Sequence, residues 1–233
     1  PGVTDRSTCT NAQTVQEAVP IPVFIIPGNH DPHGAGSVYG RSAWKSEVPG
    51  NVTVLTGRKA IGLPDRNVFL FPCPLSQKRS REDPTAWIAE SDVDSGDAIR
   101  IGLAHGALDI HEKDYEFPIS PDRAETGSLD YLALGDWHGM YVHDPHTAYS
   151  GTPEQTNFGE KNAGNVLLVT IEERGSEPSI EAVEVGKLQW MRWEEQIREG
   201  TAEELRQRVR DIQSPETTLL RLIAEGAADR NTF

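Results

Sequence analysis

Three apolar segments of this chain end alike, in a glycine beside a side chain that can bind a metal ion. They are Val23–Ile26 before Gly28-Asn29-His30-Asp31, Ile99–Ala104 before His105-Gly106, and Tyr131–Leu134 before Gly135-Asp136-Trp137-His138-Gly139. Unbroken β-prone runs predict strands buried on both faces, as in an α/β core. Ligands of such sheets bind beyond the carboxyl ends of the strands, so three such ends predict one shared site.

The residue types at these strand ends favour a transition-metal site. An amide oxygen, imidazole and carboxylate together suit Mn²⁺, Fe or Zn²⁺ better than Ca²⁺, and no thiolate takes part. A single histidine at a strand end is most often structural. Core packing gives no reason for the same pattern to occur three times, so we interpret it as functional.

The rest of the chain alternates short strands with turns and charged loops. We expect further strands at Val52–Leu55 and Val68–Phe71, and a hairpin of Asn165–Glu173 and Ile180–Val185. A short helix is expected over residues 37–48 and a helical turn around Trp87. Residues 8–19 have the pattern of the end of a helix. Residues 76–97 and 109–128 are polar enough to be surface loops.

The C-terminal stretch has the pattern of a second unit. Thr201-Ala202-Glu203-Glu204 fits a capping box, and Leu205, Val209 and Ile212 form one apolar stripe of the helix it would open. Ser214-Pro215 ends this helix, and Thr218–Ile223 predicts a strand. We expect Trp190 and Trp193 to pack at the junction between the two units.

Composition excludes some classes of protein. The 233 residues carry a formal net charge of −14, which argues against a protein that holds nucleic acid mainly through a basic surface. No apolar run approaches the roughly 20 residues of a membrane-spanning helix, and no signal peptide is visible. Cys9 and Cys73 have no metal-binding spacing, so a reducing cytoplasm is the expected location.

Gly28-Asn29-His30-Asp31 resembles the GNHD signature of the calcineurin-like metallophosphoesterases. His105-Gly106 and Gly135-x-x-His138 resemble the later motifs of that superfamily, in the same order. The segment Tyr149–Glu160 resembles the Tyr-Pro-Gly-Ser-Pro…Phe-Gly-Glu segment of SbcD-type DNA repair exonucleases. The resemblance covers roughly residues 20–186, and its motifs are specific only in combination.

The resemblance implies a role for each matching residue. Asn29 and His105 would bind a second metal ion, His138 would bind the first, and His30 would contact the phosphate as the catalytic residue. We expect Asp31 to hold the loop. Two divalent ions, Mn²⁺ in the first place and Fe or Zn²⁺ as alternatives, would clamp the phosphate and activate a water.

Two departures from the family pattern concern the metals. Asp136 stands where the family has a histidine; either it binds the second ion as a carboxylate, which we favour, or the second site is weak. The family's opening Asp-x-His and Gly-Asp-x-x-Asp motifs are absent, and Asp5 is the only candidate carboxylate upstream of Val23. We therefore expect an N-terminally incomplete site that binds metal poorly and turns over slowly.

The resemblance implies an α/β fold, the four-layer α/β/β/α metallophosphoesterase sandwich, with two mixed sheets inside and helices outside. Residues 1–190 would form this core and residues 191–233 the start of a small α+β capping domain. The expected function is that of a metal-dependent DNA nuclease working with an SMC-like ATPase subunit, as a homodimer and without a membrane. Two alternatives remain: hydrolysis of a small phosphoester, and a non-catalytic remnant of the fold.

Overall fold

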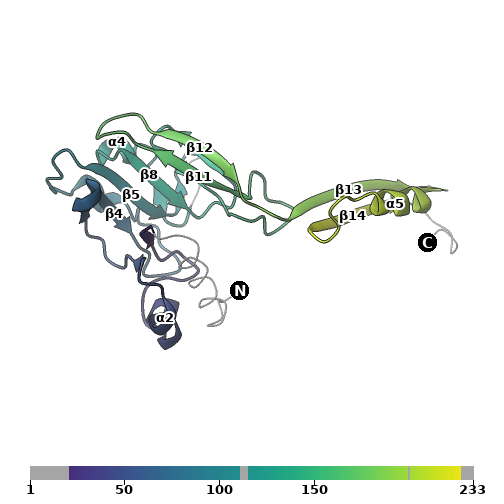
Figure 1. The fold of residues 1–233 in the computed structure, drawn as a ribbon, viewed down its shortest axis with the longest axis horizontal. Coiled ribbons are helices and arrows are strands. Elements are labelled where there is room, and N and C mark those ends of the chain that lie inside the picture. The colour runs from purple at the N-terminus through teal and green to yellow at the C-terminus, as the bar shows by residue number, and fades with distance from the viewer. Residues whose placement is uncertain (1–20, 111–114, 199, 227–233) are drawn as a thin grey trace.

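A computed structural model describes residues 21–110, 115–198 and 200–226, and shows a mixed α/β fold around a six-stranded sheet (Figure 1). The strand order is β3-β4-β5-β8-β10-β9, with the four central strands parallel and the two edge strands antiparallel to their neighbours. The bounds are β3 (Ile61–Leu63), β4 (Val68–Cys73), β5 (Ile99–His105), β8 (Tyr131–Gly135), β9 (Tyr141–Asp144) and β10 (Thr147–Tyr149).

The remaining strands form two-stranded sheets. The pairs are β1 (Val23–Ile25) with β2 (Val52–Val54), β6 (Ala107–Leu108) with β7 (Pro118–Ile119), β11 (Asn165–Thr170) with β12 (Ser179–Glu184), and β13 (Gln189–Ile197) with β14 (Thr218–Gly226). A second continuous mixed sheet, expected from the sequence, does not form among the described residues. No backbone hydrogen-bond ladder joins the β1–β2 pair to the β11–β12 pair.

The helices are short. They are η1 (Val38–Gly40), α2 (Ser42–Glu47), η2 (Pro64–Arg66), α3 (Ala86–Ala89), α4 (Arg123–Thr126) and α5 (Thr201–Arg210). Helix content is therefore lower than the predicted outer layers of helices require. Across the part of the chain that the structure describes, none of these helices has the length and apolar character needed to cross a membrane.

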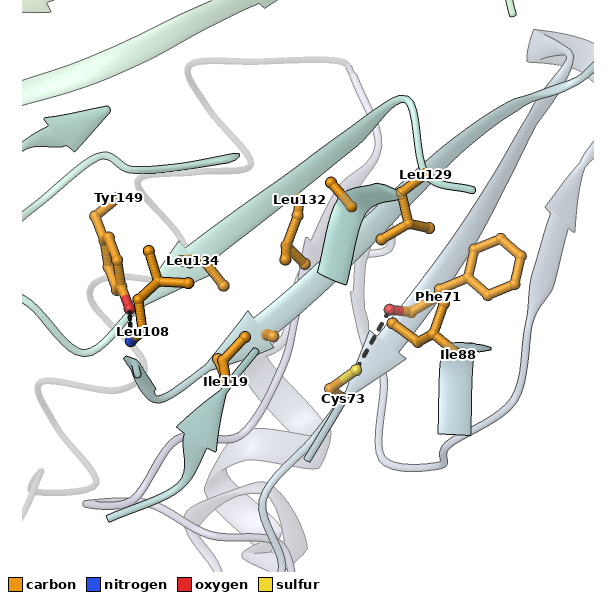
Figure 2. Packing of buried hydrophobic residues seen from close by; sticks show 11 residues of the cluster. Phe71, Cys73, Ile88, Leu108, Ile119, Leu129, Leu132, Leu134 and Tyr149 are labelled. Atoms are coloured by element: carbon orange, nitrogen blue, oxygen red, sulfur yellow. Dashed lines mark hydrogen bonds between the residues drawn. The ribbon is translucent and has the colours of Figure 1, made fainter. Parts of the chain in front are cut away.

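The hydrophobic core lies against the central parallel strands (Figure 2). Every second residue of β5 is buried, because successive side chains of a strand point to opposite faces. Phe71, Leu132 and Tyr149 are fully buried and come from three different strands, and Ile88 of α3 joins them. Each such side chain contributes about 1.5–3 kcal/mol by leaving water. The core thus fixes the strands whose ends carry the candidate site.

The apolar runs predicted as strands are confirmed, with ends that differ by a few residues. The expected hairpin is β11 and β12, with its turn at Arg174-Gly175-Ser176, and the helices over 37–48 and around Trp87 are present. Strands β3, β6, β7 and β13 and helix α4 were missed. The prediction of a surface loop over 109–128 is wrong where β7 and α4 lie, because their apolar side chains Ile119 and Ala124 are buried in the core. Residues 189–197 mix tryptophans with charged residues, so their sequence did not predict a strand. They pair over their whole length with β14, and this pairing with a distant segment decides their structure.

The capping-box prediction is wrong in detail. Helix α5 begins at Thr201 and its N-cap is Gly200, which has a left-handed backbone with φ 87°. The Thr201 hydroxyl accepts a hydrogen bond from Arg198 N (3.0 Å), and Glu204 N donates to Gly200 O (3.2 Å). A threonine already inside the helix cannot have the extended backbone that a capping box requires of its first residue.

The strands β13 and β14 and the helix between them form a parallel βαβ unit that projects away from the six-stranded sheet (Figure 1). The predicted boundary between residues 190 and 191 falls inside β13, so the division into 1–190 and 191–233 stays a prediction. The predictions for residues 8–19, Asp5 and Cys9, and residues 111–114 of the predicted 109–128 loop, lie outside the described residues.

Candidate metal centre

Asn29, His105 and Asp136 meet where β1, β5 and β8 end. His105 Nε2 lies 3.1 Å from Asn29 Oδ1 and 3.5 Å from Asp136 Oδ1, and Asn29 Nδ2 lies 3.4 Å from the same Asp136 oxygen. The side chains of His105 and Asp136 are 23% and 28% exposed, so the cluster is reached by solvent. Three of the four residues expected to meet at one site thus lie together, whereas His138 has no described contact with them.

Backbone hydrogen bonds bring the end of β1 to the sheet that carries His105. Leu75, two residues beyond β4, donates from its N–H to Pro27 O (3.0 Å) and accepts from His33 N (2.8 Å). Since β4 and β5 are neighbouring parallel strands, this pair of bonds holds the Gly28–Asp31 loop over the end of β5. Two sheets therefore contribute to one cluster.

Two glycines leave room for the His105 ring. A Cβ on Gly28 would lie 2.9 Å from His105 Cε1, and one on Gly135 would lie 3.1 Å from His105 Nδ1. Neither glycine has a positive φ, so close approach to the ring is the reason for glycine at both positions. The glycines seen beside the strand ends in the sequence thus shape the space around His105.

Asp31 holds the loop, as expected. Its carboxylate accepts a hydrogen bond from Gly28 N (3.0 Å) and a second one from the Tyr39 hydroxyl. Burial, and then this hydrogen bond and the charge of Asp31, raise the pKa of Tyr39 above its usual value. Asp31 is therefore occupied by loop contacts, which fix the backbone that carries Asn29.

The segment that carries Asp136 is held by the buried Tyr149. Tyr149 donates to Gly106 O (2.8 Å) and accepts from Leu108 N (2.9 Å), and its ring stacks on Trp137 with centroids 5.1 Å apart. Asp136 itself has φ 115°, a backbone that non-glycine residues rarely adopt. These contacts keep a strained backbone in place where the side chain of Asp136 reaches His105.

His138 makes a different contact. Its Nδ1 lies 2.5 Å from Glu160 Oε1, and its side chain is 55% exposed. Burial of the Glu160 carboxyl raises its pKa, but hydrogen bonds from Thr156 and His138 outweigh burial and lower the pKa to about 2. An ionised carboxylate only accepts hydrogen bonds, so His138 Nδ1 is the donor of this bond.

Glu160 is a residue whose role the sequence did not reveal. It closes the predicted Phe-Gly-Glu segment, and besides His138 it accepts hydrogen bonds from Thr156 and Asn157. A carboxylate that orients a histidine is the usual partner of a metal-binding imidazole. The spacing of 22 residues between His138 and Glu160 carries no periodic signal that could have linked them.

The other predicted residues have simpler surroundings. His30 is exposed and has no hydrogen-bond partner among the described residues. His143 and His146 lie on the β9–β10 hairpin. Trp190 packs against Phe158, with ring centroids 4.7 Å apart, and Arg208 lies over the Trp193 ring. The two tryptophans therefore have packing roles.

The donor set suits one divalent transition metal. Ligands bound at about 2.0–2.2 Å lie about 3.0–3.5 Å from one another, and the contacts of His105 Nε2 fall in that range. In residues 21–110, 115–198 and 200–226, no three His, Cys, Asp or Glu side chains are grouped as metal ligands. The cluster has two such side chains, and its third donor is the Asn29 amide.

Comparison with known proteins adds no family assignment. No protein-family model matches this sequence, and no curated protein matches it.

Proposed function

We propose that this chain is a metal-dependent phosphodiesterase that resembles the SbcD-type nucleases and hydrolyses DNA phosphodiester bonds. One observation carries the proposal: Asn29, His105 and Asp136, from three strand ends, lie within 3.1–3.5 Å of one another. Two glycines lie beside them, and a Cβ atom at either glycine would crowd the His105 ring. Core packing requires neither the three polar side chains nor the space kept around them.

Asn29, His105 and Asp136 would hold one divalent ion, Mn²⁺ in the first place, and His138 would take part in holding another. Such ions, when bound, neutralise phosphate charge and lower the pKa of water. Glu160 orients His138, and Asp31 fixes the loop that carries Asn29. His30, exposed on that loop, would donate a hydrogen bond to a phosphate oxygen and protonate the leaving oxygen.

The finer features of the fold belong to the same proposal. The four-layer sandwich would place β1–β2 and β11–β12 in a second sheet, and the β13–α5–β14 unit would begin a capping domain. The proposed partners are DNA as substrate, an SMC-like ATPase and a second copy of the chain, in the cytoplasm. A net charge of −14 implies that bound metal or a partner provides the positive charge that DNA needs.

Metal binding by matched variants tests the proposal. Mn²⁺ binding to the purified chain is measured by electron paramagnetic resonance for the wild type, His105→Ala, Asp136→Asn and the control His33→Ala, an exposed histidine of the same loop region. We expect the first two variants to lose at least about tenfold in affinity and the control to keep it. Equal binding by all four proteins would contradict the proposed site.

Substrate preference is the second readout. Mn²⁺-dependent cleavage of a linear DNA duplex is compared with hydrolysis of a small aryl phosphate by the same preparations. Faster turnover of the duplex, lost in His105→Ala and in His30→Ala, is the expected result. Turnover of the aryl phosphate alone would move the assignment to a small phosphoester.

A non-catalytic role is the second candidate, and the donor set favours it. The cluster has only two His or Asp ligands, and His138 has its described contact with Glu160 rather than with the cluster. A chain that binds Mn²⁺ but cleaves neither substrate would support this role.

A further inference from the structure

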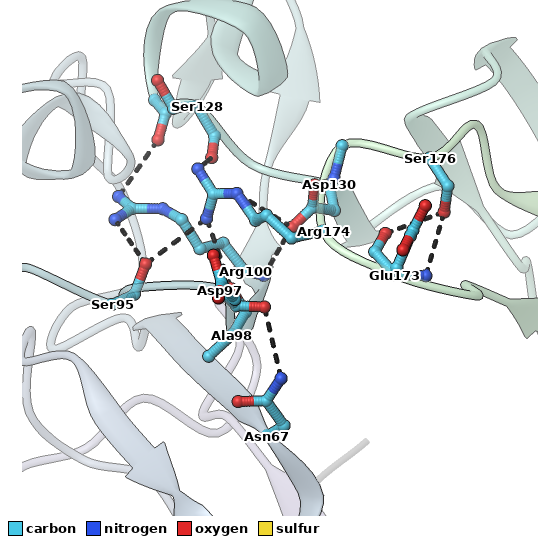
Figure 3. A network of polar contacts seen from close by, with 12 residues as sticks. Asn67, Ser95, Asp97, Ala98, Arg100, Ser128, Asp130, Glu173, Arg174 and Ser176 are labelled. Carbon is cyan, nitrogen blue, oxygen red and sulfur yellow. Dashed lines mark hydrogen bonds and ion pairs between the residues drawn. The ribbon is translucent and has the colours of Figure 1, made fainter.

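A second cluster of polar side chains lies at the other end of the central parallel strands, where these strands begin. Arg100 is near the start of β5, five residues before His105, and Asp130 directly precedes β8. Five strand residues span about 16 Å, so this edge is well separated from the candidate metal centre. The turn between β11 and β12 brings Arg174 to the same place (Figure 3).

The two arginines converge on one serine. Arg100 Nη1 and Arg174 Nη1 both donate to Ser95 Oγ, at 3.5 and 3.4 Å (Figure 3). Asp130 is buried, with 4% of its surface exposed. Its carboxylate accepts hydrogen bonds from Arg100 N and Gly175 N and lies 3.7 Å from Arg174 Nε. Only the Arg174 guanidinium pairs with this carboxylate, since Arg100 meets it through its backbone N–H, so two guanidinium groups stand beside one buried carboxylate and positive charge is in excess.

Other contacts of the guanidinium groups are to main-chain carbonyls. Arg100 donates to Val93 O and Gly127 O, both at 3.2 Å, and Arg174 donates to Ala98 O and Ser128 O. These bonds fix both side chains without neutralising their charge. One face of the Arg100 guanidinium is also covered by the Phe71 ring, 4.2 Å from the ring centroid.

Two hydrogen-bond donors remain without acceptors. Arg100 is only 6% exposed, and its buried Nε has no partner. Ser95 Oγ accepts from both arginines, and its own proton has no acceptor among the described residues. A buried donor without a partner costs about 1–3 kcal/mol, so an acceptor at this position would be strongly favoured.

A cavity of about 320 Å³ opens beside these donors. Its walls include Arg100, Arg174 and Ser95, together with Ser91, Thr126 and the 127–128 backbone, and they are mostly polar. The carboxylate of Asp94 also lines it, but Asp94 is exposed and its Oδ1 accepts from Gly96 N (3.0 Å). Water screens this exposed charge, whereas the guanidinium charge of Arg100 is buried.

We propose that this cavity binds a small tetrahedral oxyanion of the phosphate class, held by Arg100, Arg174 and Ser95. An oxyanion would accept from Ser95 Oγ and Arg100 Nε and would neutralise the excess charge of the arginine pair. Burial, and then the charge of Arg174, lower the pKa of Arg100 against the effect of Asp130, as expected for an electropositive pocket. The proposal does not depend on the proposed function.

The test measures binding of inorganic phosphate to the full chain by isothermal titration calorimetry, in EDTA so that no bound metal contributes. The variants are Ser95→Ala and Arg174→Gln. The controls are Arg66→Gln, an exposed arginine of η2, and His105→Ala in the candidate metal centre. We expect one phosphate per chain, binding weakened at least about tenfold in both variants, and no change in either control.

Folding of each variant is checked by thermal unfolding, and Arg174→Lys gives a second test that keeps the charge but removes the planar fork. It is expected to bind phosphate with an intermediate affinity. The same titration with a mononucleotide in place of inorganic phosphate distinguishes binding of free phosphate from binding of a nucleotide phosphate. Absence of phosphate binding to the wild type, equal binding by Ser95→Ala and Arg174→Gln, or loss of binding in His105→Ala would each overturn the proposal.

Discussion

His138 and Glu160 form a close pair, with 2.5 Å between Nδ1 of the imidazole and Oε1 of the carboxylate. The carboxylate side chain is 7% exposed and is held by Thr156 and Asn157, whereas the histidine is more than half exposed. The Glu160 carboxylate is therefore held in place, whereas the His138 imidazole is accessible to solvent. The exposed imidazole of His138 is therefore within reach of a ligand while its Nδ1 is held by Glu160.

Substitution Glu160→Gln tests whether this orientation serves metal binding. The amide can place its NH₂ group toward His138 and so favour the wrong tautomer. We expect Mn²⁺ affinity to fall about 10–100-fold, as for other partners of metal-binding histidines. Glu172→Gln, at an exposed position, is the matched control. If Glu160→Gln lowered affinity equally in a His138→Ala background, the effect would not pass through His138.

The Glu160 carboxyl should also make stability depend on pH. Its pKa is lowered from 4.5 to about 2 in the folded chain, so the carboxylate stabilises the fold above about pH 4.5. This stabilisation is lost as the pH falls from about 4.5 toward 2. Urea unfolding of wild type and Glu160→Gln should show a difference in unfolding free energy that shrinks over this range. A difference constant from pH 7 to 3 would contradict the assignment.

Gly28→Ala should disturb the cluster with little effect on the rest of the fold. The new Cβ would lie 2.9–3.2 Å from three atoms of the His105 ring, so the ring must move. We expect a loss of about 1–3 kcal/mol in stability from overpacking, with weaker Mn²⁺ binding and shifted ring resonances of His105 in NMR spectra. Gly34→Ala, whose nearest contact is 3.8 Å, should change none of these.

Tyr149→Phe should destabilise the chain through two lost hydrogen bonds. The change leaves Leu108 N and Gly106 O without the hydroxyl that joins them in the core. We expect a decrease of about 1–3 kcal/mol in unfolding free energy, measured by urea titration. Tyr141→Phe is the control, because the Tyr141 hydroxyl has no hydrogen bond in the described structure. Equal losses in both variants would contradict a stabilising role of the two hydrogen bonds made by the Tyr149 hydroxyl.

Much of the fold could be predicted from local pattern. The runs at Val23, Ile99 and Tyr131 are strands because β-branched and aromatic residues fit a buried pleated surface. Glycines beside these runs predicted close approach, and Gly28 and Gly135 do face the His105 ring. The pairing of β13 with β14 was missed, because a parallel partner more than twenty residues away leaves no local signal.

The amino-acid sequence by itself determined which apolar runs form strands, to within a few residues at their ends, and which polar side chains stand at their tips, since both depend on neighbouring residues. Only the tertiary structure decided that Asn29 reaches His105 from another sheet, that Glu160 holds His138, and that Arg100 and Arg174 share Ser95. Except for the bond between Arg100 and Ser95, which are five residues apart, these contacts join positions 22 to 79 residues apart. Their formation depends on sheet order and loop path rather than on periodicity.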